Sequence, residues 1–335
     1  MIGVGAFGRN HARLYHRLAT AGKVEFAGVC DSDAARAAAV AREFETEAYS
    51  SLEELLESAK PQAVSVAVPT SAHLEVARAL MQAGVDVLIE KPLANSLEEA
   101  DELIRVAQQQ KRIAQVGQLE RFNPAVRATV PLITQPMFFE VHRLSVFTPR
   151  SLDVDVVLDL MIHDLDIVLS FLDSPVKEIR AVGLPILTPK VDIANVRMEF
   201  DSGCVANFTA SRVSTERVRK LRFFQPHQYI SVDYTRQDVV AFHVEADDAD
   251  PTALAAMEKD AGAQHPSGPQ IKISKPEVRR EEPLEAELLA FLDAVRTRQQ
   301  PIVPLEDGRR ALSVALDILA RIREHSRRLN LEKLR

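Results

Sequence analysis

The sequence predicts a parallel α/β domain over residues 1–120, followed by an α+β domain over residues 121–335 with a large, open, mainly antiparallel sheet. Two observations support this fold class. In the first third, short apolar segments alternate with amphipathic helices, which is typical of βαβ units. From Phe138 onward, apolar and polar residues alternate in runs separated by turns such as Asp201-Ser202-Gly203, a pattern that indicates antiparallel hairpins. A chain of 335 residues is long enough for two domains.

Composition excludes several classes of protein. The apolar fraction of 46% is that of an ordinary globular chain, and a net charge of −7 without a basic block argues against nucleic-acid binding. No apolar run approaches the ~20 residues that a membrane span requires, and the first residues do not resemble a signal peptide. Cys30 and Cys204 lie far apart, which predicts neither a disulfide framework nor a zinc site and favours the cytoplasm.

The elements of the first domain follow in order. A helix follows the first glycines and ends at Gly22, and residues 24–31 are rich in strand-forming residues. Ser51 and Ser96 each precede a glutamate by three residues, the capping box that begins a helix. Between and after these helices we expect further buried strands and one more helix, at residues 63–68 (strand), 73–84 (helix), 85–92 (strand) and 112–118 (strand).

A glycine motif stands at the first turn from strand to helix. Gly3-Val4-Gly5-Ala6-Phe7-Gly8 matches G-x-G-x-x-G, in which the glycines allow a tight turn and let the backbone approach a pyrophosphate at the helix N-terminus. Asp31 ends the next strand, where a carboxylate can bind the adenosine ribose hydroxyls and repel a 2′-phosphate. We therefore expect a Rossmann domain that binds NAD rather than NADP. The alternative is a plain glycine turn beside a surface aspartate.

The first strand is short in this sequence. Met1 and Ile2 alone precede Gly3, whereas such a strand usually has about five residues. Either the start of the sequence is placed late or residues are missing, and we expect the edge of the cofactor site to be affected.

Residues 157–168, VLDLMIHDLDIV, combine an aliphatic helix with buried charge. On a regular helix Asp155, Asp159, His163 and Asp166 share one narrow stripe. Buried charges are costly unless they are paired or used, so the stripe is either a structural network or a reaction site. A metal site made by Asp159, His163 and Asp166 is a weaker alternative, and we expect no metal.

Lys91 closes a buried strand at the carboxyl edge of the parallel sheet, where ligands of open α/β sheets bind. Burial lowers a lysine pKa, and such an amine can accept the proton of a secondary alcohol. The alternative is a surface lysine at a strand end. Glu90 points to the other side of the strand and is expected to support the loop, and Pro92 shapes the turn that follows.

Several motifs together resemble a known family. GVGAFGRNHAR, VPTSAH, Glu90-Lys91-Pro92, the D-x-x-x-H pair Asp159/His163 and the ending from Pro283 resemble the Gfo/Idh/MocA oxidoreductases over nearly the whole chain. The resemblance implies an NAD-binding domain, a catalytic Lys91, and Asp159 and His163 as its partners across the cleft. It also implies a homodimer or homotetramer formed through the C-terminal sheet.

A narrower resemblance concerns the substrate. GQLERFNPAV and RLSVFTPRSLDVDVVLDLMIHDLDIV are similar to a branch that oxidises the 3-hydroxyl of UDP-N-acetylglucosamine to the 3-keto sugar, a step towards a 2,3-diamino sugar for lipid A. Three alternatives remain open: a dehydrogenase of a free sugar or polyol such as inositol, an NAD-using glycosidase, and a dinucleotide sensor without catalysis.

Further candidate residues follow the strand ends. The residues expected along the cofactor, besides the glycine loop and Asp31, are Pro69, Thr70, His73, Glu90, Lys91 and Gln118. A surface position is the alternative for His73. The residues expected to bind a sugar or a diphosphate are Arg121, Asn123, Arg143 and Arg150. For these, an ordinary surface position or a structural role is the alternative.

Overall fold

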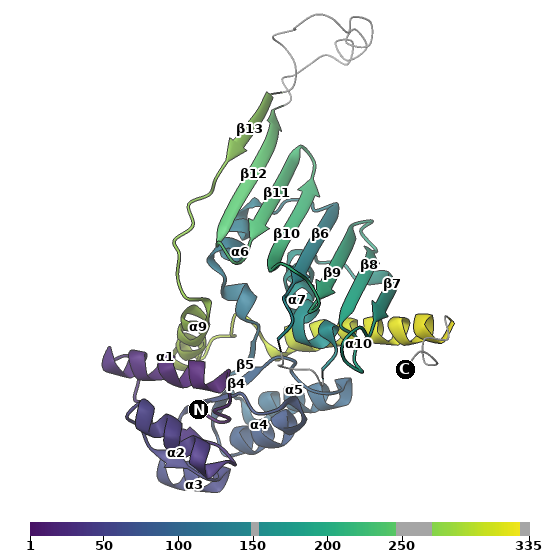
Figure 1. Ribbon diagram of the computed structural model, residues 1–335. Coiled ribbons are helices and arrows are strands. Elements are labelled where there is room, and N and C mark those ends of the chain that lie inside the picture. The colour runs from purple at the N-terminus through teal and green to yellow at the C-terminus, as the bar shows by residue number, and fades with distance from the viewer. Residues whose placement is uncertain (149–153, 246–269, 329–335) are drawn as a thin grey trace, which may run out of the picture.

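The computed structural model describes residues 1–148, 154–245 and 270–328, and it has two parts, each built around a sheet (Figure 1). The predicted fold class is confirmed, with a parallel sheet in the first part and an eight-stranded sheet in the second. The helices of the first part surround the short strands at one end of the molecule, and the large sheet fans out from them (Figure 1).

The first part contains two groups of parallel strands. β1 (Val29–Cys30) pairs with β2 (Ala48–Tyr49), and β3, β4 and β5 pair in that order. Ile2 forms parallel bridges to Cys30 and to Val66, so this single residue joins the two groups. The remaining strands are β3 (Ala63–Val66), β4 (Asp86–Glu90) and β5 (Ala114–Gly117). The helices are α1 (Gly8–Thr20), α2 (Ala34–Glu43), α3 (Leu52–Ser58), η1 (Thr70–Ala72), α4 (His73–Gln82) and α5 (Leu97–Gln110).

The helix starts follow the expected chemistry. Oγ of Ser51 and of Ser96 accepts a hydrogen bond from the backbone N–H three residues on, as a capping box requires. The strand expected over residues 24–31 is shorter than predicted, because only Val29–Cys30 is paired. Residues 24–28 have strand-forming side chains, but no strand of the described residues pairs with them.

The second part is an eight-stranded sheet in the order β13-β12-β11-β10-β6-β9-β8-β7. All neighbours are antiparallel except β6 and β9, which run parallel. The strands are β6 (Phe138–Leu144), β7 (Val176–Leu184), β8 (Ile193–Phe200), β9 (Val205–Ser211), β10 (Val218–Gln225), β11 (Gln228–Asp233), β12 (Asp238–Glu245) and β13 (Gln270–Ser274). The sequence pattern missed β13 but predicted the first seven, as alternating runs at residues 138–144, 178–184, 194–200, 204–212, 220–224, 229–234 and 239–244.

Helices cover one face of this sheet, and shorter helices connect it to the first part. η4 (Val157–Met161), α7 (Ile162–Phe171) and α10 (Leu305–Arg328) pack on the apolar side, with buried residues such as Ile167, Phe208 and Ile318 in one core. η2 (Leu119–Phe122), α6 (Pro124–Thr129) and η3 (Val130–Leu132) connect the two parts. The opposite face carries a row of ring contacts from Phe138 to Phe224, Tyr229 and Phe242, with centroids 4.9–5.7 Å apart.

The last two helices return to the first part. Helix α9 (Pro283–Thr297) buries Leu284, Leu288 and Phe291 against Leu14 and Leu18 of α1. Helix α10 contributes Leu312 to the core of the first part and Ile318 to the core of the second. The chain therefore closes by fastening the two parts together.

This packing predicts the cost of shortening Leu288, which is fully buried between α9 and α1. Leu288→Ala should lower the free energy of unfolding by about 2–5 kcal/mol, because it removes apolar contacts and leaves a cavity. Urea unfolding followed by circular dichroism measures the change. Leu187→Ala, at a side chain that is more than half exposed, is the control and should stay within about 0.5 kcal/mol of the wild type. An equal loss in both variants would contradict the packing.

Candidate active site

The glycine loop leaves open space at the start of α1. Gly3 has a φ of 81°, and a Cβ there would lie 2.7 Å from the backbone of Ala67. A Cβ on Gly8 would collide with the Gly3 carbonyl oxygen, whereas nothing lies within 4 Å of a Cβ built on Gly5. Two glycines thus permit tight packing, and the third keeps room for a ligand at the positive end of α1.

Asp31 joins this loop to a pocket. Its Oδ2 accepts a hydrogen bond from the Val4 N–H at 2.8 Å, and its Oδ1 accepts one from the Asp33 N–H at 2.9 Å. A pocket of about 580 Å³ lies beside it, lined by Gly3, Gly5 and Pro69 among others. These residues fit a dinucleotide: the loop can hold the pyrophosphate and the carboxylate can face the adenosine ribose.

Lys91 extends from the end of β4 to the second part of the molecule. Its Nζ donates a hydrogen bond to the Asp159 carbonyl oxygen at 2.8 Å and lies 3.5 Å from Asp159 Oδ1. About a fifth of the Lys91 side chain remains exposed. The amine and the carboxylate that the sequence predicted as partners are therefore in contact across the two parts.

The sequence predicted that Asp155, Asp159, His163 and Asp166 share one stripe of a regular α-helix. This prediction is wrong in one respect. Val157–Met161 form a turn of π-helix, and Asp155 lies before it with its Oδ1 accepting a hydrogen bond from the Val191 N–H. The wider turn changes the direction of the side chains that precede α7. No hydrogen bond or ion pair joins Asp159 to His163 within the described ranges, so Asp159 faces Lys91 instead of the imidazole.

His163 lies at the start of α7 in a positive environment. Burial lowers the pKa of its imidazole well below the usual value, and the charges of Lys91, Arg143 and Arg219 lower it further. Its Nδ1 is buried and has no hydrogen-bond partner in the described part of the chain. The ring is therefore neutral at pH 7 and can accept a proton or a hydrogen bond.

Asp159 has a second charged neighbour, Arg212, for which the sequence predicted no role. Arg212 follows β9, is almost fully buried, and donates a hydrogen bond from Nη2 to the Val154 carbonyl oxygen at 2.6 Å. The same nitrogen lies 3.8 Å from Asp159 Oδ2. Nothing in the local sequence around Arg212 indicates this contact, because it depends on how β9 packs against η4.

Comparison with known proteins places this geometry in a family. Residues 1–118 match the model "Oxidoreductase family, NAD-binding Rossmann fold", and residues 135–231 match the model "GFO/IDH/MocA C-terminal domain". The UDP-N-acetylglucosamine 3-dehydrogenase of Acidithiobacillus ferrooxidans is 37% identical over 319 residues, which cover 95% of each chain. The chain belongs to the Gfo/Idh/MocA oxidoreductases.

A solved structure of that enzyme and one further relative support the assignment. A solved structure of the Acidithiobacillus ferrooxidans enzyme, UDP-N-acetylglucosamine 3-dehydrogenase GnnA, superposes with a TM-score of 0.84 at 35% identity and 96% coverage of both chains. The scyllo-inositol 2-dehydrogenase (NAD(+)) of Bacillus subtilis is 29% identical over 230 residues, which cover 64% of this chain and 67% of the relative. The family is NAD-binding, in agreement with the fit of the glycine loop and Asp31.

In this family member, the E-K-P segment is held by buried histidines. His11 Nε2 lies 3.0 Å from Glu90 Oε1, and Glu90 Oε2 accepts a 3.3 Å hydrogen bond from the Lys91 N–H. His73, for which a surface position was the alternative, is buried and contacts the carbonyl oxygens of Val68 and Pro92 at 3.0 Å. The peptide between Lys91 and Pro92 is cis. His73 thus ties the turn containing Pro69 and Thr70 to the loop after Lys91.

Two of the residues predicted to bind substrate, Arg143 and Asn123, are buried and have partners inside the protein. Arg143 is buried and donates to both Asp164 oxygens, at 2.6 and 2.9 Å, and to Glu120 at 2.9 Å. Asn123 caps α6 through the Ala125 N–H. Both side chains are buried and their polar groups are engaged within the protein, and their contact with substrate stays a prediction.

The other predicted site residues in this region differ in their surroundings. Arg121 donates to Asp307 at 3.2 Å and lies 3.7 Å from Asp166, so it joins the two parts of the molecule. Gln118 is buried, and its Oε1 has no partner among the described residues. Arg150 lies outside the described residues.

Two buried acids near this junction have raised pKa values. Burial raises the pKa of Glu287 on α9 well above its usual value, and the charges of Glu90 and Asp166 add to this effect. Burial also raises the pKa of Asp166 to about 7, although Arg121 opposes the shift. No cluster of three metal-binding side chains occurs in residues 1–148, 154–245 and 270–328. The helices in these ranges include none that is long and apolar enough to cross a membrane.

The raised pKa of Asp166 predicts a pH dependence of stability. The protonated form is stabilised by folding, so its contribution is complete below about pH 4 and is lost as the pH rises towards about 7. Asp166→Asn, which stays neutral, should gain stability relative to wild type over that range. Urea midpoints between pH 4.5 and 8 measure the difference. Asp173→Asn, at an exposed position, should show no such trend, and a pH-independent difference for Asp166→Asn would contradict the assignment.

Proposed function

We propose that this protein is an NAD-dependent dehydrogenase that oxidises the 3-hydroxyl of UDP-N-acetylglucosamine to the 3-keto sugar. The observation that carries the proposal is the contact between Lys91 and Asp159 beside a neutral His163. The relative of 37% identity that bears this activity in its name supports the choice of substrate. The 3-keto product suits conversion to an amine, the class of reaction that leads to a 2,3-diamino sugar of lipid A.

The chemistry requires a base and an acceptor for hydride. NAD, when bound, supplies the acceptor at its nicotinamide ring. The protein supplies the base: the single hydroxyl proton of the substrate moves to the uncharged amine of Lys91. His163 either donates a hydrogen bond from its ring N–H to the hydroxyl oxygen or takes the proton in place of Lys91. Asp159, backed by Arg212, holds the amine in place, so the reacting groups meet without a search through many conformations.

A cation for the diphosphate is present at Arg219 on β10. It is the cross-strand neighbour of Arg143 on β6, and its charge reaches His163. Arg143 is fully paired, whereas Arg219 makes no hydrogen bond or ion pair within the described residues. We propose that Arg219 binds a phosphate of the sugar nucleotide, since a free guanidinium beside the site suits that group.

Asp31 favours NAD over NADP in this proposal. Its carboxylate is buried at the rim of the nucleotide pocket, where a 2′-phosphate would bring a second negative charge close to it. Arg36 also contacts Asp31, at 3.3 Å, and only partly offsets this charge because its side chain is about half exposed.

A second candidate is oxidation of a free polyol, as the name of the scyllo-inositol relative suggests. The unpaired Arg219 favours a phosphorylated substrate over a polyol. An assay of NADH absorbance with UDP-N-acetylglucosamine, N-acetylglucosamine and inositol separates the two, and turnover of inositol alone would exclude our proposal. Sugar release without net NADH would indicate a glycosidase.

The open face of the large sheet supports an oligomer. The aromatic row from Phe138 to Phe242 crosses four strands, and Phe224 within it is about two-fifths exposed. A row of rings on an uncovered sheet face is typical of a subunit contact. We propose a homodimer or homotetramer formed through this face.

Lys91→Met tests the role of the amine. It should lower kcat by at least about 100-fold, because it removes the base, while NAD binding stays unchanged. NADH absorbance and calorimetric titration with NAD measure the two quantities. Lys177→Met, at an exposed lysine on β7, is the control and should keep its kcat. Normal turnover of Lys91→Met would refute the assignment.

Arg219→Gln tests recognition of the diphosphate. The KM for UDP-N-acetylglucosamine should rise about 10- to 100-fold with a smaller change in kcat, the expected effect of losing one charge-assisted hydrogen bond. Arg222→Gln is a matched control on the same strand, because Arg222 faces the opposite side and pairs with Glu140 at 3.3 Å. An equal rise in KM for both variants would show that the effect is a general loss of positive charge.

A further inference from the structure

Glu287 on α9 is a buried acid without a hydrogen-bond partner. Its side chain is fully buried, and neither of its carboxyl oxygens has a partner among the described residues. The other buried residues on this face of α9 include Leu284, Leu288 and Phe291, so the acid interrupts an apolar stripe. A buried polar group is costly unless it is hydrogen-bonded, so the position of Glu287 requires an explanation.

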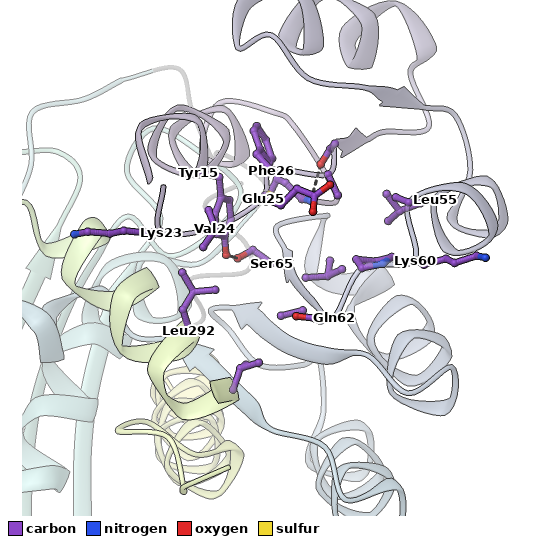
Figure 2. Close-up of a pocket in the computed structure, with 18 of the residues that line it drawn as sticks. Tyr15, Lys23, Val24, Glu25, Phe26, Leu55, Lys60, Gln62, Ser65 and Leu292 are labelled. Atoms are coloured by element: carbon purple, nitrogen blue, oxygen red, sulfur yellow. Dashed lines mark hydrogen bonds between the residues drawn. The ribbon is translucent and has the colours of Figure 1, made fainter. Parts of the chain in front are cut away.

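The layer between α1, α9 and the parallel sheet contains other polar side chains. Figure 2 shows Tyr15 of α1 and Ser65 of β3 pointing toward one another, and their hydroxyl oxygens lie 2.6 Å apart. Burial raises the pKa of Tyr15, and a charge on Glu287 adds to the rise, although Ser65 opposes it. Tyr15 and Ser65 thus satisfy one another, and Glu287 lies close to them without taking part.

Glu90 reaches the same layer from the end of β4. Its Oε1 lies 3.0 Å from Nε2 of His11 on α1, and its Oε2 accepts the hydrogen bond from the Lys91 N–H. Gly117 on β5 is the cross-strand partner of Glu90, and a Cβ on Gly117 would lie 2.6 Å from Glu90 Oε1. The carboxyl group of Glu90 therefore occupies the room that the missing side chain of Gly117 leaves.

The two acids are close enough to influence one another. Burial raises the pKa of Glu287 well above its usual value, and the charges of Glu90 and Asp166 raise it further. This favours the acid form of Glu287, whose O–H needs an acceptor. Glu90 can be that acceptor, because the two oxygens of a carboxylate together offer about four lone-pair sites.

Gln115 on β5 also lacks a partner. It is fully buried, and neither Nε2 nor Oε1 of its amide is hydrogen-bonded within the described ranges. It precedes Gly117 by two positions, so its side chain leaves β5 on the side where the carboxyl group of Glu90 lies. Polar groups that are buried together without direct contact are commonly bridged by an ordered water, which makes about three hydrogen bonds.

We propose that Glu287 is a positioning residue for Lys91, to which it is coupled through a buried water molecule and the carboxyl group of Glu90. The acid donates its O–H to the water. The water donates one proton to Glu90, which accepts the Lys91 N–H, and the other to Gln115 Oε1. This link restrains the backbone of Lys91, from which the side chain reaches Asp159. Its effect on turnover rests on the proposed role of Lys91 as the base, whereas the restraint itself does not.

The test compares Glu287→Gln and Glu287→Met with the wild type. The amide of glutamine is neutral and keeps a donor, whereas methionine has a similar volume and no donor. Amide hydrogen exchange at Lys91 should be about 10-fold faster in Glu287→Met, the effect of losing one buried hydrogen bond, and nearly unchanged in Glu287→Gln. The kcat for UDP-N-acetylglucosamine should follow the same order, falling about 10-fold or more in Glu287→Met, while the Kd for NAD stays unchanged.

Glu285→Met is the matched control for both measurements. Glu285 lies on the same helix, is partly exposed, and pairs with Arg17 of α1. Its replacement removes an acid from α9 without touching the layer that contains Glu90, so exchange at Lys91 and kcat should stay at their wild-type values.

Infrared spectroscopy tests the protonation of Glu287 without any need for turnover. The difference spectrum between the wild type and Glu287→Gln at pH 7 should contain the carbonyl band of a protonated carboxylic acid. The difference spectrum for Glu285→Gln should contain carboxylate bands only, because that side chain is ion-paired at the surface.

Two results would overturn the proposal. One is a difference spectrum for Glu287→Gln that contains carboxylate bands only. The other is equal exchange at Lys91 in Glu287→Met and Glu287→Gln. Normal turnover of Lys91→Met would instead remove the proposed function, and the infrared and exchange measurements would still decide the role of Glu287.

Discussion

The hydrogen bond from Lys91 Nζ to the Asp159 carbonyl oxygen is the contact on which the rest of the site depends. Lys91 follows β4, which contributes to the core of the first part. Asp159 lies in η4, which contributes with α7 to the core of the second part. The geometry therefore requires that the two parts of the molecule be held in one arrangement. Helix α10 does this by placing Leu312 in the first core and Ile318 in the second, and α9 adds Leu288 and Phe291 against α1.

The charged side chains around this contact differ in whether an opposite charge lies beside them. Arg143 is buried and would be costly alone, but Asp164 and Glu120 compensate it. Arg212 supports Asp159 in a similar way from β9. Arg219 lies on the same side of the sheet without a partner among the described residues, so it remains available to an anion. Burial, followed by the nearby positive charges, lowers the pKa of His163 and keeps its ring in the neutral form.

The nucleotide half depends on a small number of backbone contacts. Ile2 joins the two groups of parallel strands, and the glycine loop begins at the next residue. Asp31 adds a second link, because its carboxylate holds the Val4 N–H.

The sequence by itself determined the fold class, the family and NAD as the cofactor, and it predicted Lys91, Asp159 and His163 as the catalytic residues. These features could be predicted because glycine spacing, capping boxes and the periods of the strands depend on residues that are close together in the sequence. Seven of the eight strands of the large sheet were predicted for the same reason. The strand over residues 24–31 was overestimated, because pairing depends on a neighbour that is distant in sequence.

Only the tertiary structure decided which charges are free. The sequence treated Arg143 as a substrate ligand and did not consider Arg212 or Arg219, since an arginine looks the same in sequence whether or not a carboxylate faces it. The sequence also did not predict the π-helical turn at Val157–Met161. With this turn, Asp159 faces Lys91 rather than His163. Side-chain partners are set by packing between segments far apart in the chain, and no local pattern carries that information.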